Sequence, residues 1–345
     1  MTIGSGRAAT ATGAGPAPVA EAGTTGRPLP PHAPLANAMA LAVGLRGALA
    51  SVLLGSDDAV TTAVVAALSG SHLLIEDVPG VGKTVLARAL ATALGAGLAR
   101  VQGHPDLLPS DVTGVSVFAQ DTRSWEFRPG PVFAPVVLLD ELNRTPPRTQ
   151  SALLEAMEEG QVSVDGTSWP LPRPHLVVAT QNPVGQLGTY PLVESQLDRF
   201  GLSTTIGYPD AEVEQRLVLH DGGRDALAAL DPAGSPAAWE AAIDATSTVT
   251  VAPAVAAYAV AVVRATRTAP SVRLGASPRA AIALIRCAQA RSVLDQRTYV
   301  TPDDVQGVAV ACLAHRLVVD GAAPTGRAGR AVVDEVLAAT PVPVL

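Results

Sequence analysis

A single lysine, Lys83, stands among the 24 Lys and Arg residues of this 345-residue chain. It lies in the segment Ile75-Glu-Asp-Val-Pro-Gly-Val-Gly-Lys-Thr84, where an apolar run gives way to a helical pattern. Gly80 and Gly82 let the backbone curl without interference from a Cβ atom. The amides of such a loop, with the N-terminus of the following helix, form a positive cradle for phosphate groups. A compact ammonium fits this cradle better than a planar guanidinium, which explains why an arginine-rich composition keeps a lysine here.

This strand-loop-helix segment resembles the P-loop, or Walker A motif, in which the lysine reaches the β- and γ-phosphates and the next hydroxyl ligates Mg²⁺. We therefore predict that Lys83 binds phosphate and that Thr84 binds the metal. The predicted cradle comprises Val78, Pro79, Gly80, Val81, Gly82, Lys83, Thr84 and Val85. One position departs from the strict motif, because Asp77 stands where its first glycine is expected. The alternative is a chance Gly/Pro turn before a helix.

Two acids end a later apolar run, Val136-Val-Leu-Leu-Asp140-Glu141. A buried strand that ends in this way is typical of a Walker B motif. We expect Asp140 to hold Mg²⁺, mostly through its water shell, and Glu141 to polarise the attacking water. A glutamate directly after the aspartate favours hydrolysis over nucleotide binding alone. Two solvated acids at a strand end are the alternative.

A third apolar run, Val177-Val-Ala-Thr-Gln-Asn182, ends in an amide. Asn182 at the end of such a strand can orient the attacking water and sense the γ-phosphate. The alternative is a turn-forming asparagine before Pro183.

Two arginines complete the set of candidate site residues. Arg199 is predicted to lie at a domain edge, away from the phosphates of its own chain, where it would act in trans as a finger in a neighbour's site. A surface pair with Asp198 is the alternative.

Arg279 stands in the first turn of a predicted helix, against the helix dipole. We expect it to reach across to the nucleotide and to couple the position of the helical domain to the phosphate state. The alternative is an exposed arginine that costs little.

A parallel sheet is the element that must position these residues. Between His72 and Thr180, short apolar runs alternate with helical stretches, which is typical of an α/β fold. Strands are expected over residues 72–75, 98–102, 136–139 and 176–180, and helices over 41–52, 58–68, 83–94 and 147–158. Two segments, Gly114–Gly130 and Gln161–Pro170, interrupt the alternation and are predicted to be β-hairpins.

Strand signals largely stop after Tyr208-Pro209. Helices are expected over residues 211–220, 253–267, 278–294, 302–315 and 330–337. We therefore predict an α/β nucleotide-binding domain over residues 35–208 and an all-α lid domain over 209–345. Residues 1–34, which are rich in Ala, Gly, Pro and Thr, have too few large apolar side chains to offset chain entropy and are predicted to be a disordered tail.

Composition excludes several other classes. The two cysteines, Cys287 and Cys312, cannot form a disulfide framework, so we expect a reducing compartment and a cytoplasmic protein. No secretion-signal pattern opens the sequence, and no uninterrupted apolar run reaches the roughly 20 residues of a membrane span. The net charge of -7 argues against general nucleic-acid binding. The six histidines show no spacing typical of metal ligands.

Taken in order, these motifs resemble those of AAA+ ATPases, and the finer match is to the MoxR family within the helix-2-insert clade. The family's style of sequence appears in Gln102–Gly114, Phe127–Phe133, Leu139–Arg144, Pro147–Glu159, Gly275–Ala280 and Tyr299–Val305. The resemblance covers about residues 53–317. Besides Asp77, a departure is His104, where the family more often has threonine.

The resemblance implies more than the motifs show. It implies that ATP and Mg²⁺ are the cofactors, that Leu54 and Gly55 contact the adenine, and that the hairpins are the clade's insertions. MoxR ATPases form rings, usually hexamers, and act as chaperone-like machines that mature a protein client, sometimes by metal insertion. Many MoxR ATPases work beside a partner protein with a von Willebrand factor A domain.

The leading hypothesis is therefore a Mg²⁺-dependent ATPase that remodels a protein client. One alternative keeps the fold and changes the task to the motor subunit of a metal chelatase. Another is a nucleotide-gated scaffold with little turnover, although the full set of catalytic residues speaks against it. A nucleic-acid motor is disfavoured by the negative charge.

Overall fold

The computed structural model describes residue 1 and residues 32–182, 188–219, 224–321 and 326–344. The chain divides into two compact units, Met1–Pro30 and Pro31–Leu345, and all described helices and strands belong to the second. The predicted disordered tail lies almost wholly outside the described residues. Helix α1 (Ala33–Val52) includes the last two residues of that expected tail.

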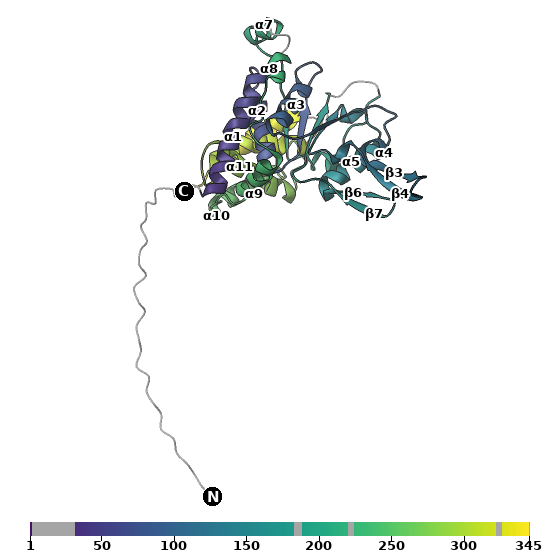
Figure 1. Ribbon diagram of the computed structural model, residues 1–345. Coiled ribbons are helices and arrows are strands. Elements are labelled where there is room, and N and C mark those ends of the chain that lie inside the picture. The colour runs from purple at the N-terminus through teal and green to yellow at the C-terminus, as the bar shows by residue number, and fades with distance from the viewer. Residues whose placement is uncertain (2–31, 183–187, 220–223, 322–325, 345) are drawn as a thin grey trace. The chain divides into compact units, whose positions relative to one another are not determined.

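A five-stranded parallel sheet forms the centre of the fold, as predicted (Figure 1). Its spatial order is β2 (Leu98–Gln102), β5 (Val136–Asp140), β8 (Leu176–Gln181), β1 (Leu73–Glu76) and β9 (Leu202–Thr204). The sequence analysis did not predict β9, because three residues are too short for a periodic signal. All pairings are parallel, so the carboxyl ends of β1, β5 and β8 meet at one edge of the sheet.

Alternate residues of the central strands face two separate cores. On β1, Leu73 and Ile75 belong to the larger core, whereas Leu74 belongs to the smaller one. Successive strand side chains point to opposite faces, so a sheet covered on both sides has continuously apolar strands. This is why the strand segments show apolar runs rather than alternation.

Helices α1, α2 (Asp57–Ser69) and α3 (Lys83–Ala93) contribute to the larger core. Helix α5 (Pro147–Glu159) packs through Leu153 and Leu154 in the smaller one. The shorter elements are α4 (Pro109–Thr113), α6 (Glu194–Leu197), and the 3-10 turns η1 (Pro131–Phe133) and η2 (Leu142–Arg144).

Helix α1 is the one helix among the described residues that is long and apolar enough to cross a membrane by length and composition alone. Leu45 and Leu49 are fully buried inside the protein, and the helix packs against α2, α3 and the later helix α9 (Pro236–Ser247). Its apolar residues are thus used in the protein core.

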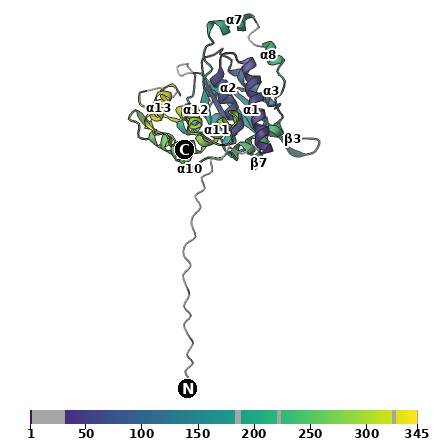
Figure 2. The ribbon, with the colours of Figure 1, turned by 90° about the vertical axis from the view of Figure 1, so that its left-hand side faces the viewer.

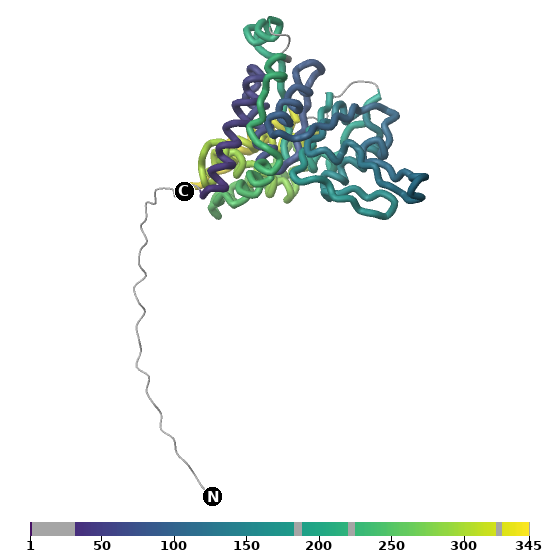
Figure 3. Tube along the Cα trace, in the orientation of Figure 1, coloured from purple at the N-terminus to yellow at the C-terminus, as the bar shows by residue number. Residues whose placement is uncertain are grey.

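Both predicted hairpins are present. Strands β3 (Gly114–Ala119) and β4 (Ser124–Pro129) form the first, and β6 (Gln161–Val164) and β7 (Thr167–Pro170) form the second. The tube trace shows them side by side (Figure 3). The rings of Phe127 and Trp169 stack between them, with centroids 4.5 Å apart, so the two insertions are linked by an aromatic contact.

After β9 the described chain is almost entirely helical. The helices are α7 (Ala211–Leu219), α8 (Arg224–Ala228), α9 (Pro236–Ser247), α10 (Pro253–Ala265), α11 (Pro278–Leu294), α12 (Pro302–Leu313) and α13 (Gly326–Ala339). Figure 2 shows α12 between α13 and α11, and α11 packs against α2. A 3-10 turn, η4 (Ala314–Arg316), and a short antiparallel pair, β10 (Val272–Leu274) with β11 (Val318–Val319), complete this part. The expected helix end at His220 lies outside the described residues.

Helix α9 was not predicted, although the sequence contains its start signal. Ser235 caps the helix by accepting a hydrogen bond from the Ala238 amide, and Pro236 occupies the first helical position. Trp239 is buried and donates its indole N–H to the Ala67 carbonyl at 2.8 Å. That contact fixes α9 against α2.

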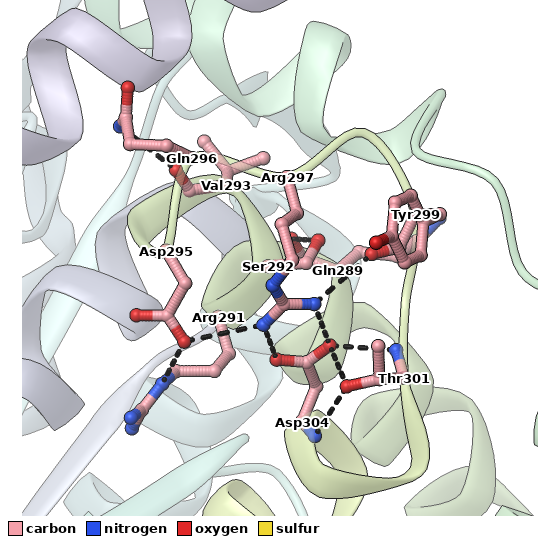
Figure 4. A network of polar contacts seen from close by, with 10 residues as sticks. All are labelled: Gln289, Arg291, Ser292, Val293, Asp295, Gln296, Arg297, Tyr299, Thr301 and Asp304. Atoms are coloured by element: carbon pink, nitrogen blue, oxygen red, sulfur yellow. Dashed lines mark hydrogen bonds and ion pairs between the residues drawn. The ribbon is translucent and has the colours of Figure 1, made fainter. Parts of the chain in front are cut away.

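The turn between α11 and α12 is held by a polar network (Figure 4). Arg297 pairs with both carboxylate oxygens of Asp304, at 2.5 and 2.6 Å, and Asp304 is only 2% exposed. Asp304 also accepts the backbone N–H of Thr301, whose hydroxyl in turn accepts the Asp304 amide. This capping box and bidentate pair fix the angle between the two helices.

His72, which directly precedes β1, joins the sheet to α5. Its Nδ1 accepts the Val177 N–H at 3.1 Å, so its Nε2 carries the proton and donates to the Met157 carbonyl at 3.3 Å. Burial, and then the neighbouring His175, lower the pKa of His72 to about 4. The neutral ring is therefore required by the fold.

We predict that acid destabilises the protein through this group. A histidine whose folded pKa lies below its unfolded value of 6.5 stabilises the fold above that value and loses the contribution as the pH falls toward 4. The loss at pH 5 is about 2 kcal/mol. Thermal melts at pH 7.5 and 5 test this. The fall in Tm should be smaller in His72→Asn than in the wild type or in a control, His104→Asn, at an exposed site. Equal falls in all three proteins would contradict the assignment.

Candidate nucleotide-binding site

The predicted phosphate cradle has the backbone of a P-loop. Gly80 and Gly82 adopt φ values of +87° and +102°, and the space around each would admit a Cβ atom, so glycine is needed for its conformation rather than for its size. Gly82 is the N-cap of α3, which starts at Lys83. The loop thus presents its amides and a helix N-terminus at the carboxyl end of β1.

Lys83 is turned into the site and is 7% exposed. Its Nζ donates to the Asp77 carbonyl oxygen at 2.6 Å and to Asn182 Oδ1 at 2.7 Å. Burial lowers the pKa of Lys83, and the nearby carboxylates of Asp77, Asp140 and Glu141 oppose that shift. Lysine and asparagine, 99 residues apart in the chain, meet because β1 and β8 are neighbours.

The two acids after β5 are held in distinct ways. Asp140 Oδ1 accepts the Thr180 hydroxyl at 2.8 Å, and its Oδ2 pairs with Arg100 at 2.6 Å. Glu141 Oε1 accepts the amide of Asn182 at 3.2 Å, and its Oε2 pairs with Arg144 at 3.0 Å. Asn182 therefore links the lysine directly to Glu141.

Glu141 has a left-handed backbone, with φ of +57°, which is uncommon for a residue with a side chain. Its N–H donates to the Thr180 hydroxyl at 2.9 Å, and its carbonyl lies against Gly103, where a Cβ atom would come within 2.2 Å of it. These contacts hold the strained residue in place, and strain of this kind gathers at functional sites.

Asp77, which replaces the first motif glycine, joins the loop to the chain that follows β9. Its Oδ1 accepts the Val78 N–H at 2.8 Å, and its Oδ2 accepts the N–H groups of Ile206 and Gly207, each at 2.7 Å. The side chain is 6% exposed. Three amide donors satisfy the hydrogen-bonding capacity of this buried side chain. The departure from the strict motif thus has a structural role.

The donors at the site fit Mg²⁺. Two oxygen donors are available, the Thr84 hydroxyl and the Asp140 carboxylate. Mg²⁺ commonly binds one or two protein oxygens and fills its other positions with water and substrate phosphates. The described residues contain no cluster of three His, Cys, Asp or Glu side chains that would form a complete protein cage. The arrangement suits a metal that arrives with a nucleotide.

Leu54 and Gly55 lie in the turn between α1 and α2. Gly55 has φ of +72°, and Val213 of α7 packs beside it. The turn that is expected to contact the adenine therefore lies against α7, the first helix after β9.

Arg199 and Arg279 lie elsewhere. Both pair with Glu158, Arg199 at 3.0 Å and Arg279 at 2.5 Å. A surface hollow beside them is lined by Ser71 and His72, which precede β1. This is the edge at which the strands begin, opposite the P-loop. Arg199 and Arg279 thus lie together at the edge away from the P-loop of their own chain, and the contact of either arginine with a nucleotide stays a prediction.

Sequence reasoning missed several supporting residues. Arg144 had a signal, since it follows Glu141 at a spacing of three. Arg100 had none, because its pairing with Asp140 requires β2 to lie beside β5. Thr180 and Glu158 were within quoted motifs but received no role.

The comparisons agree with this geometry. The model of the "ATPase family associated with various cellular activities (AAA)" matches residues 72–202, and an "AAA lid domain" model matches residues 264–336. A putative ATPase from Cytophaga hutchinsonii has a structure with a TM-score of 0.80 and 32% identity, covering 90% of this chain and 97% of that one. Fold and site thus define an α/β AAA+ ATPase with a helical lid.

Curated relatives give the family. "Chaperone MoxR1" of Mycobacterium tuberculosis is 36% identical, covering 78% of this chain and 73% of that protein. "Protein MoxR" of Paracoccus denitrificans is 32% identical, covering 86% and 94%. "Uncharacterized protein YeaC" of Bacillus subtilis is 45% identical, covering 85% and 92%. The chain belongs to the MoxR family of AAA+ ATPases, as the sequence motifs predicted.

The position of Asp77 generates a prediction. Asp77→Gly restores the strict motif but removes the acceptor for three buried amides, so it should lower both the free energy of unfolding, by about 2–4 kcal/mol, and the affinity for ATP. Denaturant unfolding and nucleotide titration measure the two quantities. Asp111→Asn is the control, since Asp111 is exposed and accepts only one amide, that of Leu108. Unchanged stability and affinity in Asp77→Gly would refute the role of this side chain.

Proposed function

We propose that this ATPase uses ATP and Mg²⁺ to drive the maturation or remodelling of a protein client. The observation that carries the catalytic part is the continuous set of contacts from Lys83 through Asn182 to Glu141. It joins a phosphate-binding cation, an amide and a carboxylate at the carboxyl end of the sheet. These are the groups needed to hold a γ-phosphate and a water molecule next to each other.

In the proposed reaction the loop amides and Lys83 bind the β- and γ-phosphates. Thr84 and Asp140 would hold Mg²⁺, which when bound offsets phosphate charge. Glu141 accepts a hydrogen bond from the attacking water, and Asn182 keeps that carboxylate aligned. Water adds to the γ-phosphorus as the bond to the ADP oxygen breaks. The turn at Leu54 and Gly55 is proposed to contact the adenine.

The arginines on the other edge are proposed to serve a neighbouring subunit. Arg199 and Arg279 lie opposite their own P-loop, so a site that uses them must be completed by a second chain. A ring, expected to be a hexamer, supplies such neighbours. A developing negative charge on the γ-phosphate would be stabilised by the donated guanidinium groups.

We also propose a chaperone-like role for this ATPase in the cell. The name of one relative describes it as a chaperone, which supports a protein client. The two hairpins support membership of the helix-2-insert clade, and they are proposed to transmit motion to the client or to a partner with a von Willebrand factor A domain.

The two free, buried cysteines are compatible with a cytoplasmic location. The hairpins also support a second candidate, the motor subunit of a metal chelatase.

Glu141→Gln tests the catalytic assignment. The amide cannot polarise water, so phosphate release should fall at least about 100-fold while ATP still binds. Steady-state phosphate release and binding of a fluorescent ATP analogue measure the two effects. Glu159→Gln, an exposed change on α5, is the control and should behave like the wild type. Normal turnover by Glu141→Gln would remove Glu141 from the mechanism.

The shared site is tested by mixing two variants. Arg199→Ala and Lys83→Ala should each be inactive alone. In mixed rings some Arg199→Ala subunits, whose P-loops are intact, would receive Arg199 from a Lys83→Ala neighbour, so part of the activity should return. No recovery under conditions in which subunits exchange would argue against action in trans.

A further inference from the structure

Glu158 binds the two arginines at once. Its Oε2 is 3.0 Å from Nη2 of Arg199, and its Oε1 is 2.5 Å from Nη2 of Arg279. Glu158 is the penultimate residue of α5, Arg199 precedes β9, and Arg279 stands in the first turn of α11. Three elements that are distant in the sequence thus converge on one carboxylate.

The backbone around the two arginines is also held. Asp198 accepts the Ser277 hydroxyl at 3.0 Å, and its other oxygen lies 2.9 Å from Nε of Arg316. Arg316 is buried and donates to the Phe200 carbonyl at 2.8 Å. The residue before Arg199 is therefore joined to the cap of the helix that carries Arg279. The two arginine side chains themselves are held by their contacts with Glu158.

Each guanidinium keeps donors free for a ligand. Glu158 contacts one terminal nitrogen of each arginine. Within the described part of the chain, neither guanidinium has another hydrogen-bond or ion-pair partner. A guanidinium has five N–H donors in a rigid fork, so most of them stay available. Both arginines therefore keep N–H donors of the kind that binds phosphate oxygens, and the shared carboxylate holds the two groups next to each other.

A stabilising role does not account for this arrangement. The side chains of Arg199, Arg279 and Glu158 are 26%, 54% and 29% exposed, and ion pairs that remain in contact with solvent contribute little to folding. Without the carboxylate, two like charges would lie side by side and Arg279 would oppose the dipole of its helix. Hydrogen bonding to Arg279 lowers the pKa of Glu158, which keeps the carboxylate charged.

We propose that Glu158 is a positioning residue that holds Arg199 and Arg279 as a pre-spaced pair for the γ-phosphate in the neighbouring subunit. The inference rests on the proposed action in trans. It adds that the two arginines are donated together and that a third side chain of the donor subunit sets their geometry. Glu158 itself touches neither nucleotide nor water in this mechanism.

The first experiment separates turnover from nucleotide binding. Glu158→Ala should lower kcat about 10-fold or more and leave KM for ATP within about twofold, because the subunit's own P-loop is intact. Glu158→Asp, which keeps the charge on a shorter side chain, should recover part of the loss. Glu159→Ala, the neighbouring exposed glutamate, should match the wild type. Wild-type kcat in Glu158→Ala would overturn the proposal.

The second experiment asks which subunit carries the defect. Glu158→Ala mixed with Lys83→Ala should regain activity, since the first protein has complete P-loops and the second donates a correctly held arginine pair. Glu158→Ala mixed with Arg199→Ala should not, because neither protein donates such a pair. Circular dichroism and ring assembly by light scattering establish that each variant folds and assembles.

The outcomes distinguish the two proposals. Suppose that Arg199→Ala and Lys83→Ala complement each other while Glu158→Ala and Lys83→Ala do not. The shared site then stands and the role of Glu158 is overturned. If neither mixture recovers although subunits exchange, action in trans fails and the inference fails with it.

Discussion

The contact between the Lys83 ammonium and the Asn182 amide depends on the order of the strands in the sheet. These residues end up adjacent because β1 lies between β8 and β9 and runs parallel to both. The same alignment brings the acids that end β5 to that edge. A side chain on the wrong strand, or a strand in the opposite direction, would separate the cation from the carboxylates. Parallel pairing is therefore the constraint from which the site geometry follows.

The free chain satisfies each functional group with a partner of its own. Lys83 donates to Asn182 and to a loop carbonyl, Asp140 pairs with Arg100, and Glu141 pairs with Arg144. Buried charges without partners are costly, so these contacts allow the site to fold before any ligand binds.

The sequence was sufficient for the parts that depend on local patterns. The P-loop, the strand ends and the two hairpins carry turn residues and apolar runs that physical rules interpret directly. Strand β9 is too short for periodicity, and α9 was overlooked despite its Ser-Pro start. Contacts that require the order of the strands, such as Arg100 with Asp140, could not be found. The position of Arg279 depends on how α11 packs against α2 and α12, and no local pattern encodes that packing.

The separation of the two functional edges has a consequence for assembly. The P-loop follows one end of β1, and the arginine pair lies near the other, so the proposed action in trans would give each subunit an accepting edge and a donating edge. Two chains related by a twofold axis place identical patches together and would join edges of the same kind. A contact between unlike edges is heterologous, and it either closes into a ring or grows as an open filament. Only closure completes every site, because each open chain of subunits leaves one accepting edge without a donor.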